Sequence, residues 1–403
     1  MKAKTNKKWK TRLLAILTAI AMTITMMPQF AMSAHAAAGD PAMSLGPDTL
    51  KEGANTANAP TVYMAGIPWR VIGYGGAGVA SSTNTMTLIS NGNLATEVQF
   101  RADMEASDAN HYSKSNLISE VNTVLDKFGE KEKAGIVART LESGEYHYTP
   151  LPDCIAGDPI PSAHLWPLST KEADAMNNSL RMVDHLHQQD LANYWWLRSP
   201  GLGKNASIVY GNGEVHIVGI PVTNGRSVRP AFNYNLKTVL LTSAATGGKV
   251  SGEVGADALT EVGTNENDEW KLTVNDMYRQ SFKVTSPVRM LCDDDEVKIK
   301  YSGATTGENE YISAIVKRWD GKIKYYGRIA NATSSSGTIK LNIGGKLIED
   351  DKLYIFNEQV NGDQKTDLSS PLRELKVRKI HDLNKTEEVE ATCTEDGVEA
   401  YWT

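Results

Sequence analysis

Hydrophobic and polar residues alternate along several short segments of the chain, and turn-forming residues separate these segments. The apolar segment Ile67–Ile72 is followed by the glycine-rich stretch Gly73–Gly78 and then by a second apolar segment, Met86–Ser90. Two short strand-like segments around a glycine-rich connection are typical of a β-hairpin. The folded part of the chain is therefore predicted to begin with a hairpin.

The period then changes from that of a strand to that of a helix. Leu117, Val121, Leu125 and Phe128 recur at helical spacing, which predicts a helix that begins near Ser115. A second helix is predicted from Ser169 to about Leu191, because Ser169 and Glu172 have the spacing of a capping box. Short strands and Gly, Asn and Pro turns return over residues 194–236. Residues 61–237 are therefore predicted to form one α+β domain.

From residue 238 onward the alternation has the period of strands throughout. About seven half-buried strands at regular spacing are typical of a β-sandwich, and we predict an immunoglobulin-like sandwich over residues 238–378. The alternating apolar positions are Trp270, Leu272 and Val274; Val297, Ile299 and Tyr301; Ile312, Ala314 and Val316; Ile339, Leu341 and Ile343; Leu353 and Ile355; and Leu375 and Val377.

The N-terminus has the three-part pattern of a secretory signal peptide. Six basic residues up to Arg12 precede an apolar run, Leu13–Met27, and the small residues of Ser33–Ala37 follow. The alternative, a retained membrane anchor, is disfavoured because threonines and Pro28 interrupt a run that is short for a bilayer span. We predict a signal peptide at 1–36 and a flexible lead-in of small and polar residues at 37–60.

Charge and cysteine content narrow the function. Removing residues 1–36 takes away six of the 42 Lys and Arg, which leaves 36 against 48 Asp and Glu, a formal charge of −12. Such an acidic secreted protein is not expected to bind nucleic acid, and no later segment is apolar enough to span a membrane. The three cysteines, Cys154, Cys292 and Cys393, are too few and too far apart for a disulfide framework.

The motifs that could carry chemistry are weak. Gly73, Gly75 and Gly78 match a dinucleotide fingerprint as a string, but a strand and not a helix follows them. His185 and His187 do not share a helix face and have no third ligand nearby. Asp293–Glu296 and Asn361–Asp367 could attract calcium, but neither has the spacing of an EF-hand. We predict no cofactor and no catalytic site.

The most unusual composition is the segment Asn193–Gly201 and the glycine- and asparagine-rich residues after it. Seven residues of this segment and of the later motif SVRPAFN are predicted to form the structural core, because large aromatic side chains are usually buried and arginine can bond several carbonyls. They are Trp195, Trp196, Arg198, Ser199, Arg229, Pro230 and Phe232. Polar and aromatic residues near the turns are predicted to bind a ligand, because loops on a rigid scaffold often carry binding: Tyr194, Lys204, Asn205, Tyr210, Asn212, His216, Asn224 and Arg226.

These motifs also carry a family resemblance. The strings YWWLRSPG, ASIVYGNGEVH and SVRPAFN, with IPWRVIG, TMTLIS and LWPLSTKEA before them, resemble an uncharacterised domain of secreted proteins from Gram-positive bacteria. The resemblance covers about residues 60–237. It implies a C-type-lectin-like fold related to the formylglycine-generating enzymes, followed by the β-sandwich that often accompanies the domain. Residues 379–403 resemble the start of a cysteine-containing surface repeat, cut short at Thr403.

The resemblance does not carry an activity over to this chain. The cysteine pair of the formylglycine enzymes has no counterpart here, and the calcium-dependent sugar motifs of lectins are missing. We therefore expect a secreted or cell-surface protein that binds an extracellular glycan or protein ligand. The alternatives are a structural component of the envelope or matrix, and an enzyme that acts on carbohydrate or peptide.

Overall fold

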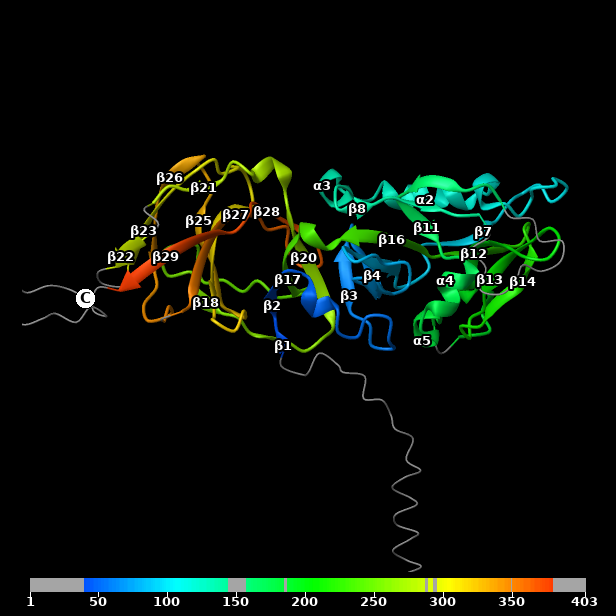
Figure 1. The fold of residues 1–403 in the computed structure, drawn as a ribbon, viewed down its shortest axis with the longest axis horizontal. Coiled ribbons are helices and arrows are strands. Elements are labelled where there is room, and N and C mark those ends of the chain that lie inside the picture. The colour runs from blue at the N-terminus through cyan, green and yellow to red at the C-terminus, as the bar shows by residue number, and fades with distance from the viewer. Residues whose placement is uncertain are drawn as a thin grey trace, which may run out of the picture.

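The computed structural model describes residues 40–143, 157–184, 187–286, 289–292, 296–348 and 350–379. The predicted signal peptide and tail, together with Cys154, His185 and Asp293–Asp295, lie outside these residues. Two strand-rich bodies lie side by side along the long axis of the molecule (Figure 1). We call them the N-terminal module, residues 61–237, and the C-terminal module, residues 238–378.

Two sheets form the N-terminal module. In the first, β4 pairs with β3 and with β6, and β6 in turn pairs with β16. The second has the order β14-β13-β12-β15-β7. The strands of the first sheet are β3 (Thr61–Met64), β4 (Ile67–Tyr74), β5 (Ala77–Gly78), β6 (Thr85–Ser90), β8 (Ile136–Val137), β11 (Leu165–Pro167) and β16 (Pro230–Asn235). Those of the second are β7 (Ala95–Gln99), β12 (Trp195–Pro200), β13 (Asn205–Val209), β14 (Val215–Pro221) and β15 (Gly225–Val228). A separate pair joins β9 (Arg139–Leu141) to β10 (Ile160–Ala163).

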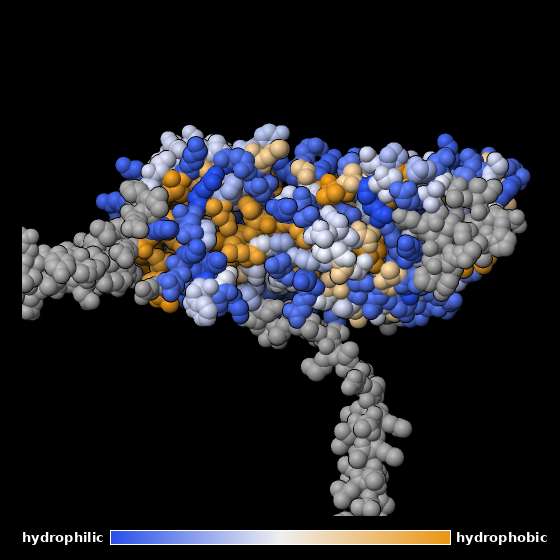
Figure 2. Space-filling view, in the orientation of Figure 1, coloured by the Kyte–Doolittle hydropathy of each residue, from blue (hydrophilic) through white to orange (hydrophobic). Residues whose placement is uncertain are grey.

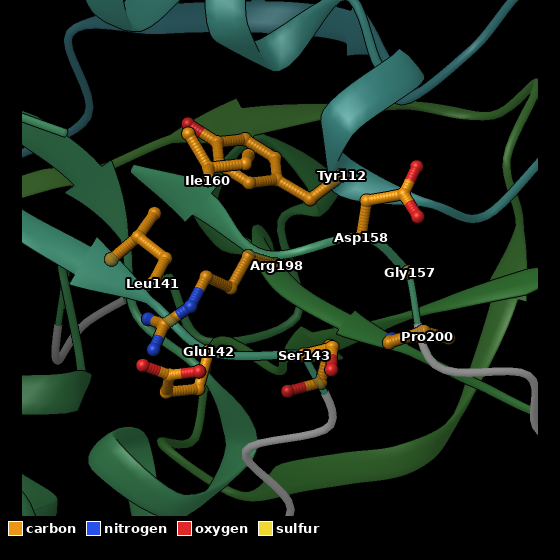
Figure 3. A pocket seen from close by; sticks show the side chains of 10 residues that line it. Tyr112, Leu141, Glu142, Ser143, Gly157, Asp158, Ile160, Arg198 and Pro200 are labelled. Atoms are coloured by element: carbon orange, nitrogen blue, oxygen red, sulfur yellow. The ribbon is translucent and has the colours of Figure 1, made fainter. Parts of the chain in front are cut away.

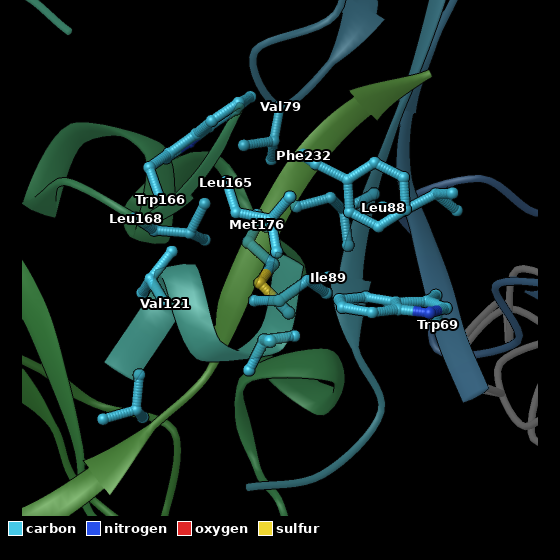
Figure 4. Packing of buried hydrophobic residues seen from close by; sticks show 14 of the residues in the cluster. Trp69, Val79, Leu88, Ile89, Val121, Leu165, Trp166, Leu168, Met176 and Phe232 are labelled. Atoms are coloured by element: carbon cyan, nitrogen blue, oxygen red, sulfur yellow. The ribbon is translucent and has the colours of Figure 1, made fainter. Parts of the chain in front are cut away.

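An aromatic core holds the N-terminal module together (Figure 4). The Trp69 ring meets Phe232 edge-on with centroids 4.8 Å apart, and Phe128 lies 5.3 Å from Phe232. Edge-to-face aromatic pairs add about 0.5–1.5 kcal/mol each beyond the area they bury. The predicted hairpin is confirmed, because β5 folds back on the tip of β4 and no helix follows the glycines.

The predicted helices are present but shorter. α2 (Leu117–Leu125) has Asn116 as its N-cap, whereas the Ser115 hydroxyl donates to the Tyr112 carbonyl before the helix begins. The capping box of Ser169 and Glu172 is confirmed at α4 (Thr170–Ala175), but the helix ends there. Asn177 then caps a separate turn, α5 (Asn178–Arg181), because its short amide competes well for backbone groups. The remaining described helix is α3 (Glu130–Lys133).

The predicted fold class, an α+β C-type-lectin-like domain followed by an immunoglobulin-like sandwich, is wrong. Strands predominate in both modules among the described residues, and helices there are few and short. Large sheets with mixed parallel and antiparallel pairing replace the expected arrangement. The capping box of Ser169 and Glu172 led the prediction to extend one helix to about Leu191, whereas α4 ends at Ala175 and Asn177 caps the separate turn α5.

Two sheets enclose the core of the C-terminal module. One contains β18, β25, β24, β27 and β29 in pairing order, and the other contains β21, β23 and β26. Alternate residues of β23, β24 and β27 fill the core between the sheets. The strands are β17 (Val239–Ala244), β18 (Thr260–Glu261), β20 (Glu269–Asn275), β21 (Lys283–Val284), β22 (Arg289–Cys292), β23 (Glu296–Ser302), β24 (Glu310–Lys317), β25 (Ile323–Asn331), β26 (Ser336–Asn342), β27 (Lys352–Gln359), β28 (Asp367–Ser369) and β29 (Arg373–Lys379).

The two modules are joined through β20. This strand pairs in parallel with β3 of the N-terminal module and with β28, and antiparallel with β17. The segment expected to be a flexible lead-in also takes part from residue 40 onward. It forms β1 (Asp40–Pro41) and β2 (Met43–Leu45), which pair with β19 (Thr264–Asn265) and β17. The Met43 side chain is fully buried there.

Truncating Leu272 on β20 should destabilise the whole molecule. Leu272 is fully buried in the core of the N-terminal module although it follows the predicted boundary at residue 237. A Leu→Ala change at such a site costs about 2–5 kcal/mol. Urea unfolding followed by tryptophan fluorescence should show that loss for Leu272→Ala, and Val254→Ala at an exposed position should show almost none. A loss below ~1 kcal/mol would contradict the packing described.

Alkaline pH should destabilise the fold through its buried tyrosines. Burial raises the pKa of Tyr112, Tyr234 and Tyr326 above the ordinary value of 10.0, and at Tyr326 the neighbouring Glu358 raises it further. Above that pH the folded state holds more protons than the unfolded chain, so the stability present below pH 10 is lost as the pH rises. The melting temperature of the parent should fall between about pH 9 and about pH 11, and that of Tyr326→Phe should fall less steeply. Equal slopes for the two proteins would count against this origin.

Candidate functional site

β12 and β16 form a buried scaffold behind the predicted binding loops. All seven residues assigned to the structural motif are buried. Arg229 donates to the carbonyl of Ser90 at 2.8 Å and to that of Leu180 at 2.9 Å, and its guanidinium lies over the Trp195 ring. Burial lowers the pKa of Arg229 to about 9, and the charge of Arg70 adds to the effect. The guanidinium fork thus joins β6 to α5 at the base of the loops.

Arg198 lies in a second polar cluster. It donates to the Glu172 carboxylate and to the Pro167 carbonyl, and Arg139 contacts the other oxygen of Glu172 at 2.7 Å. Beside Arg198 and Tyr112 is a cavity of about 30 Å³ (Figure 3). That volume holds about one water molecule, so this cavity is too small for an organic ligand.

Four of the eight predicted ligand-binding residues come together. The Tyr194 ring meets the Tyr210 ring with centroids 5.1 Å apart, and Tyr210 meets His216 at 4.8 Å. The Arg226 guanidinium lies 5.8 Å from the centre of the Tyr194 ring. All four side chains are half-buried. We call Tyr194, Tyr210, His216 and Arg226 the aromatic cluster.

A cleft of about 910 Å³ adjoins the aromatic cluster through Arg226. Its size falls within the range of small-molecule sites, about 300–1,000 Å³. Three carboxylic acids and one guanidinium give it a polar and mainly acidic lining. β7, α2, the turn before β12 and β15 contribute that lining: Glu97, Val98, Gln99, Asn116, Ser119, Glu120, Asp190, Leu191, Ala192, Gly225 and Arg226.

The pairing of β7 with β15 shapes the cleft. Gly225 passes so close to Glu97 that a Cβ at position 225 would lie about 3.0 Å from the Glu97 backbone. Glu97 itself has a φ of 56°, a left-handed conformation that is uncommon for a residue with a side chain. The Arg226 Nε atom is buried and has no hydrogen-bond partner among the described residues. A buried donor without a partner carries a free-energy cost that a bound ligand could relieve.

Arg226 is the one predicted ligand residue that lines the described cleft, and the other four predicted residues lie outside both the cleft and the aromatic cluster. Lys204 and Asn205 are at the far end of the β12–β13 hairpin, where Lys204 contacts Glu105 at 3.3 Å. Asn212 accepts a hydrogen bond from the Glu214 amide in the β13–β14 turn. Asn224 forms the turn before β15 through its amide. All four occupy turn or hairpin-end positions, and three of them are asparagines, which are favoured there for backbone reasons.

Sequence reasoning missed the acidic side of the cleft. Glu97, Glu120 and Asp190 come from segments far apart in the chain and belong to no motif. The pairing of β7 with β15 brings Glu97 near Arg226, and the packing of α2 and of the turn Leu191–Asn193 against β15 brings Glu120 and Asp190 there. The available signal was weak: Asp190 precedes a short turn whose Ala192 amide it caps at 2.9 Å.

Part of the N-terminal module is similar to a domain family whose description names no activity. A family model described as Domain of unknown function (DUF6273) matches residues 84–236, which include every residue of the cleft. This match confirms the predicted resemblance to an uncharacterised domain and goes no further. No curated protein and no solved structure matches the chain.

No helix in the part of the chain that the structure describes is long and apolar enough to cross a membrane. In the same part of the chain, no three His, Cys, Asp or Glu side chains are grouped to hold a metal ion. Of the two acidic segments considered for calcium, Asp293–Asp295 is outside the described residues, and the Asp367 carboxylate contacts lysines instead.

Replacing Arg229 with lysine should loosen the base of the site. Lysine keeps the charge but cannot fork between two carbonyls, so carbonyls now buried and paired would lose their donors. We expect Arg229→Lys to lower the free energy of unfolding by about 1–3 kcal/mol, measured by urea unfolding. Arg101→Lys, at a partly exposed ion pair with Asp108, is the matched control and should change it little. Equal stability of the two variants would contradict this role of Arg229.

Proposed function

We propose that this protein is exported and binds a glycan in the cleft beside the aromatic cluster. The observation that carries the proposal is the position of Arg226, which lines the acidic cleft and also contacts Tyr194. A ligand that fills the cleft and extends past Arg226 would therefore meet hydrogen-bonding groups first and then the rings of the aromatic cluster. The N-terminal pattern of a signal peptide supports export.

The chemistry of the lining suits a hydroxyl-rich ligand. Carboxylates accept hydrogen bonds from sugar hydroxyls, and the guanidinium donates to hydroxyl oxygens with several N–H groups. Tyr194 and Tyr210 offer ring surface to the C–H faces of a sugar, and both rings are partly exposed. The volume of the cleft would accommodate a short oligosaccharide.

A protein ligand is less favoured by the same surface. Protein interfaces usually have a desolvated centre rich in apolar and aromatic residues. Leu191, 56% exposed, is the one large apolar side chain of the described cleft lining that is exposed. On the face shown in Figure 2, the N-terminal module is largely hydrophilic, whereas hydrophobic residues gather on the C-terminal module. Trp319 and Tyr278 of the C-terminal module are each 73% exposed.

The test is binding of the purified chain to a glycan array, with titration of any hit by calorimetry. Removing a hydrogen bond to a charged group costs about 1.5–3 kcal/mol, so Arg226→Ala should raise the Kd about tenfold to a hundredfold. Tyr194→Ala should also weaken binding. Lys204→Ala is the matched control, because it removes a cation outside the cleft, and it should bind as the parent does.

Each remaining outcome counts for or against the proposal. Saturable binding that only Arg226→Ala and Tyr194→Ala weaken, with melting temperatures unchanged, supports this site. Glycan binding that Lys204→Ala weakens equally would place recognition elsewhere and overturn it. An array without hits, together with saturable binding to a matrix protein, would replace the glycan with a protein ligand.

A further inference from the structure

Four charged side chains meet in the interior of the C-terminal module. Lys249, in the turn after β17, contacts Glu358 of β27 at 2.6 Å and Asp367 of β28 at 2.9 Å. Lys271 of β20 contacts the same Asp367 oxygen at 2.9 Å. The side chains are at most 4% exposed, and the two carboxylates are fully buried. Fully buried lysines and carboxylates are rare and require an explanation.

The two oxygens of Asp367 have different surroundings. Oδ1 accepts hydrogen bonds from the Asn361 amide at 2.8 Å and from Lys271 at 3.0 Å. Oδ2 is buried beside both ammonium groups but has no contact of hydrogen-bond geometry among the described residues. One oxygen is therefore held by two donors, while the other faces the Lys249 nitrogen.

Glu358 is held in place next to Lys249. Its Oε1 accepts a hydrogen bond from the buried Tyr326 hydroxyl at 2.7 Å, which leaves Oε2 directed at Lys249. Burial acts to lower the pKa of Lys249, but the charges of Asp367 and Glu358 outweigh burial and raise it. A base close to the ammonium group is therefore needed before the nitrogen can act as a nucleophile, and Glu358 is in position to be that base.

We propose that Lys249 and Asp367 condense into an intramolecular isopeptide bond, with Glu358 as the proton carrier. Glu358 takes one proton from the Lys249 ammonium and passes it to Oδ2 of Asp367. The neutral amine then forms a C–N bond to the Asp367 carboxyl carbon. A second proton moves from nitrogen through Glu358 to Oδ2, the C–Oδ2 bond breaks, and one water leaves. Glu358 ends in its initial state, and no oxidant or other reactant is required.

The surroundings of Oδ1 fit this reaction. In the tetrahedral intermediate the negative charge develops on the oxygen that stays, which is Oδ1. Lys271 and the Asn361 amide already donate to it, as an oxyanion hole does. Lys271 is thus a charge-stabilising residue and Lys249 is the nucleophile. The bond would tie the chain just after β17, the first strand of the module, to the short strand β28 near its end.

Intact-mass spectrometry of the purified full chain tests the proposal. The parent should be lighter than its sequence by the mass of one water, and a protease digest should contain one branched peptide that joins Lys249 to Asp367. Lys249→Arg and Glu358→Gln should each restore the full mass. Glu358→Gln keeps both reacting side chains, so its full mass would identify Glu358 as the proton carrier. A parent with the full mass, measured on soluble folded protein, would overturn the proposal.

Lys340→Arg, at an exposed ion pair with Glu296, is the matched control. It leaves the buried cluster intact, so the loss of water and the Lys249 branch point should persist. A branch point at Lys271 in the parent, or a loss of water that persists in Lys249→Arg, would overturn the assignment of the nucleophile. Circular dichroism shows whether each variant is folded, so that the absence of the bond is not confused with a failure to fold. The intact mass and the branched peptide do not depend on whether the cleft of the N-terminal module binds a ligand.

Discussion

The alternation of side chains along β20 is the constraint on which the rest of the structure depends. Trp270, Leu272 and Val274 point into the core of the N-terminal module, although they follow its last strand in the sequence. Lys271, between the first two, points the other way and enters the buried charge cluster of the C-terminal module. Because successive side chains of a strand face opposite sides, one seven-residue strand is part of both interiors. A shift of one residue in its register would bury Lys271 in the apolar core.

This shared strand makes the two modules one mechanical unit. Contacts from α3 strengthen the junction: Lys131 pairs with Asp276 at 2.6 Å, and the Glu132 carboxylate accepts a hydrogen bond from Thr366 at 2.6 Å. Asp276 is itself tied to Arg279, which contacts Glu310 on β24. The cleft elements β7 and β12 lie at the end of the N-terminal module away from this junction (Figure 1). The cleft is therefore left open by the contact between the modules.

The periodicity of the sequence was sufficient for individual strands but not for their assembly. The predicted apolar positions of β4, β6, β20, β23, β24, β26, β27 and β29 all fall within or directly beside strands. What periodicity could not supply was the partner of each strand, such as the parallel pairing of β20 with β3 across more than 200 residues of chain. The same gap hid the cleft. Tyr194, Tyr210, His216 and Arg226 lie in one continuous stretch of sequence, whereas Glu97 approaches Arg226 through the pairing of β7 with β15 and Glu120 through the packing of α2 against these strands.

The charge cluster shows why a turn motif can hide chemistry. Asn361, Gly362 and Asp363 suit a turn for backbone reasons, and Asp367 follows them closely enough to suggest an ion site in a loop. In the folded chain the Asn361 amide and Lys271 instead hold the Asp367 carboxylate beside Lys249, in a place that bulk water does not reach. Burying two lysines and two carboxylates costs desolvation energy that ion pairing only partly offsets. A covalent bond between Lys249 and Asp367 would remove one charge of each sign from that interior. It would also keep β17 and β28 together when the chain is pulled, which suits a module placed behind a binding site.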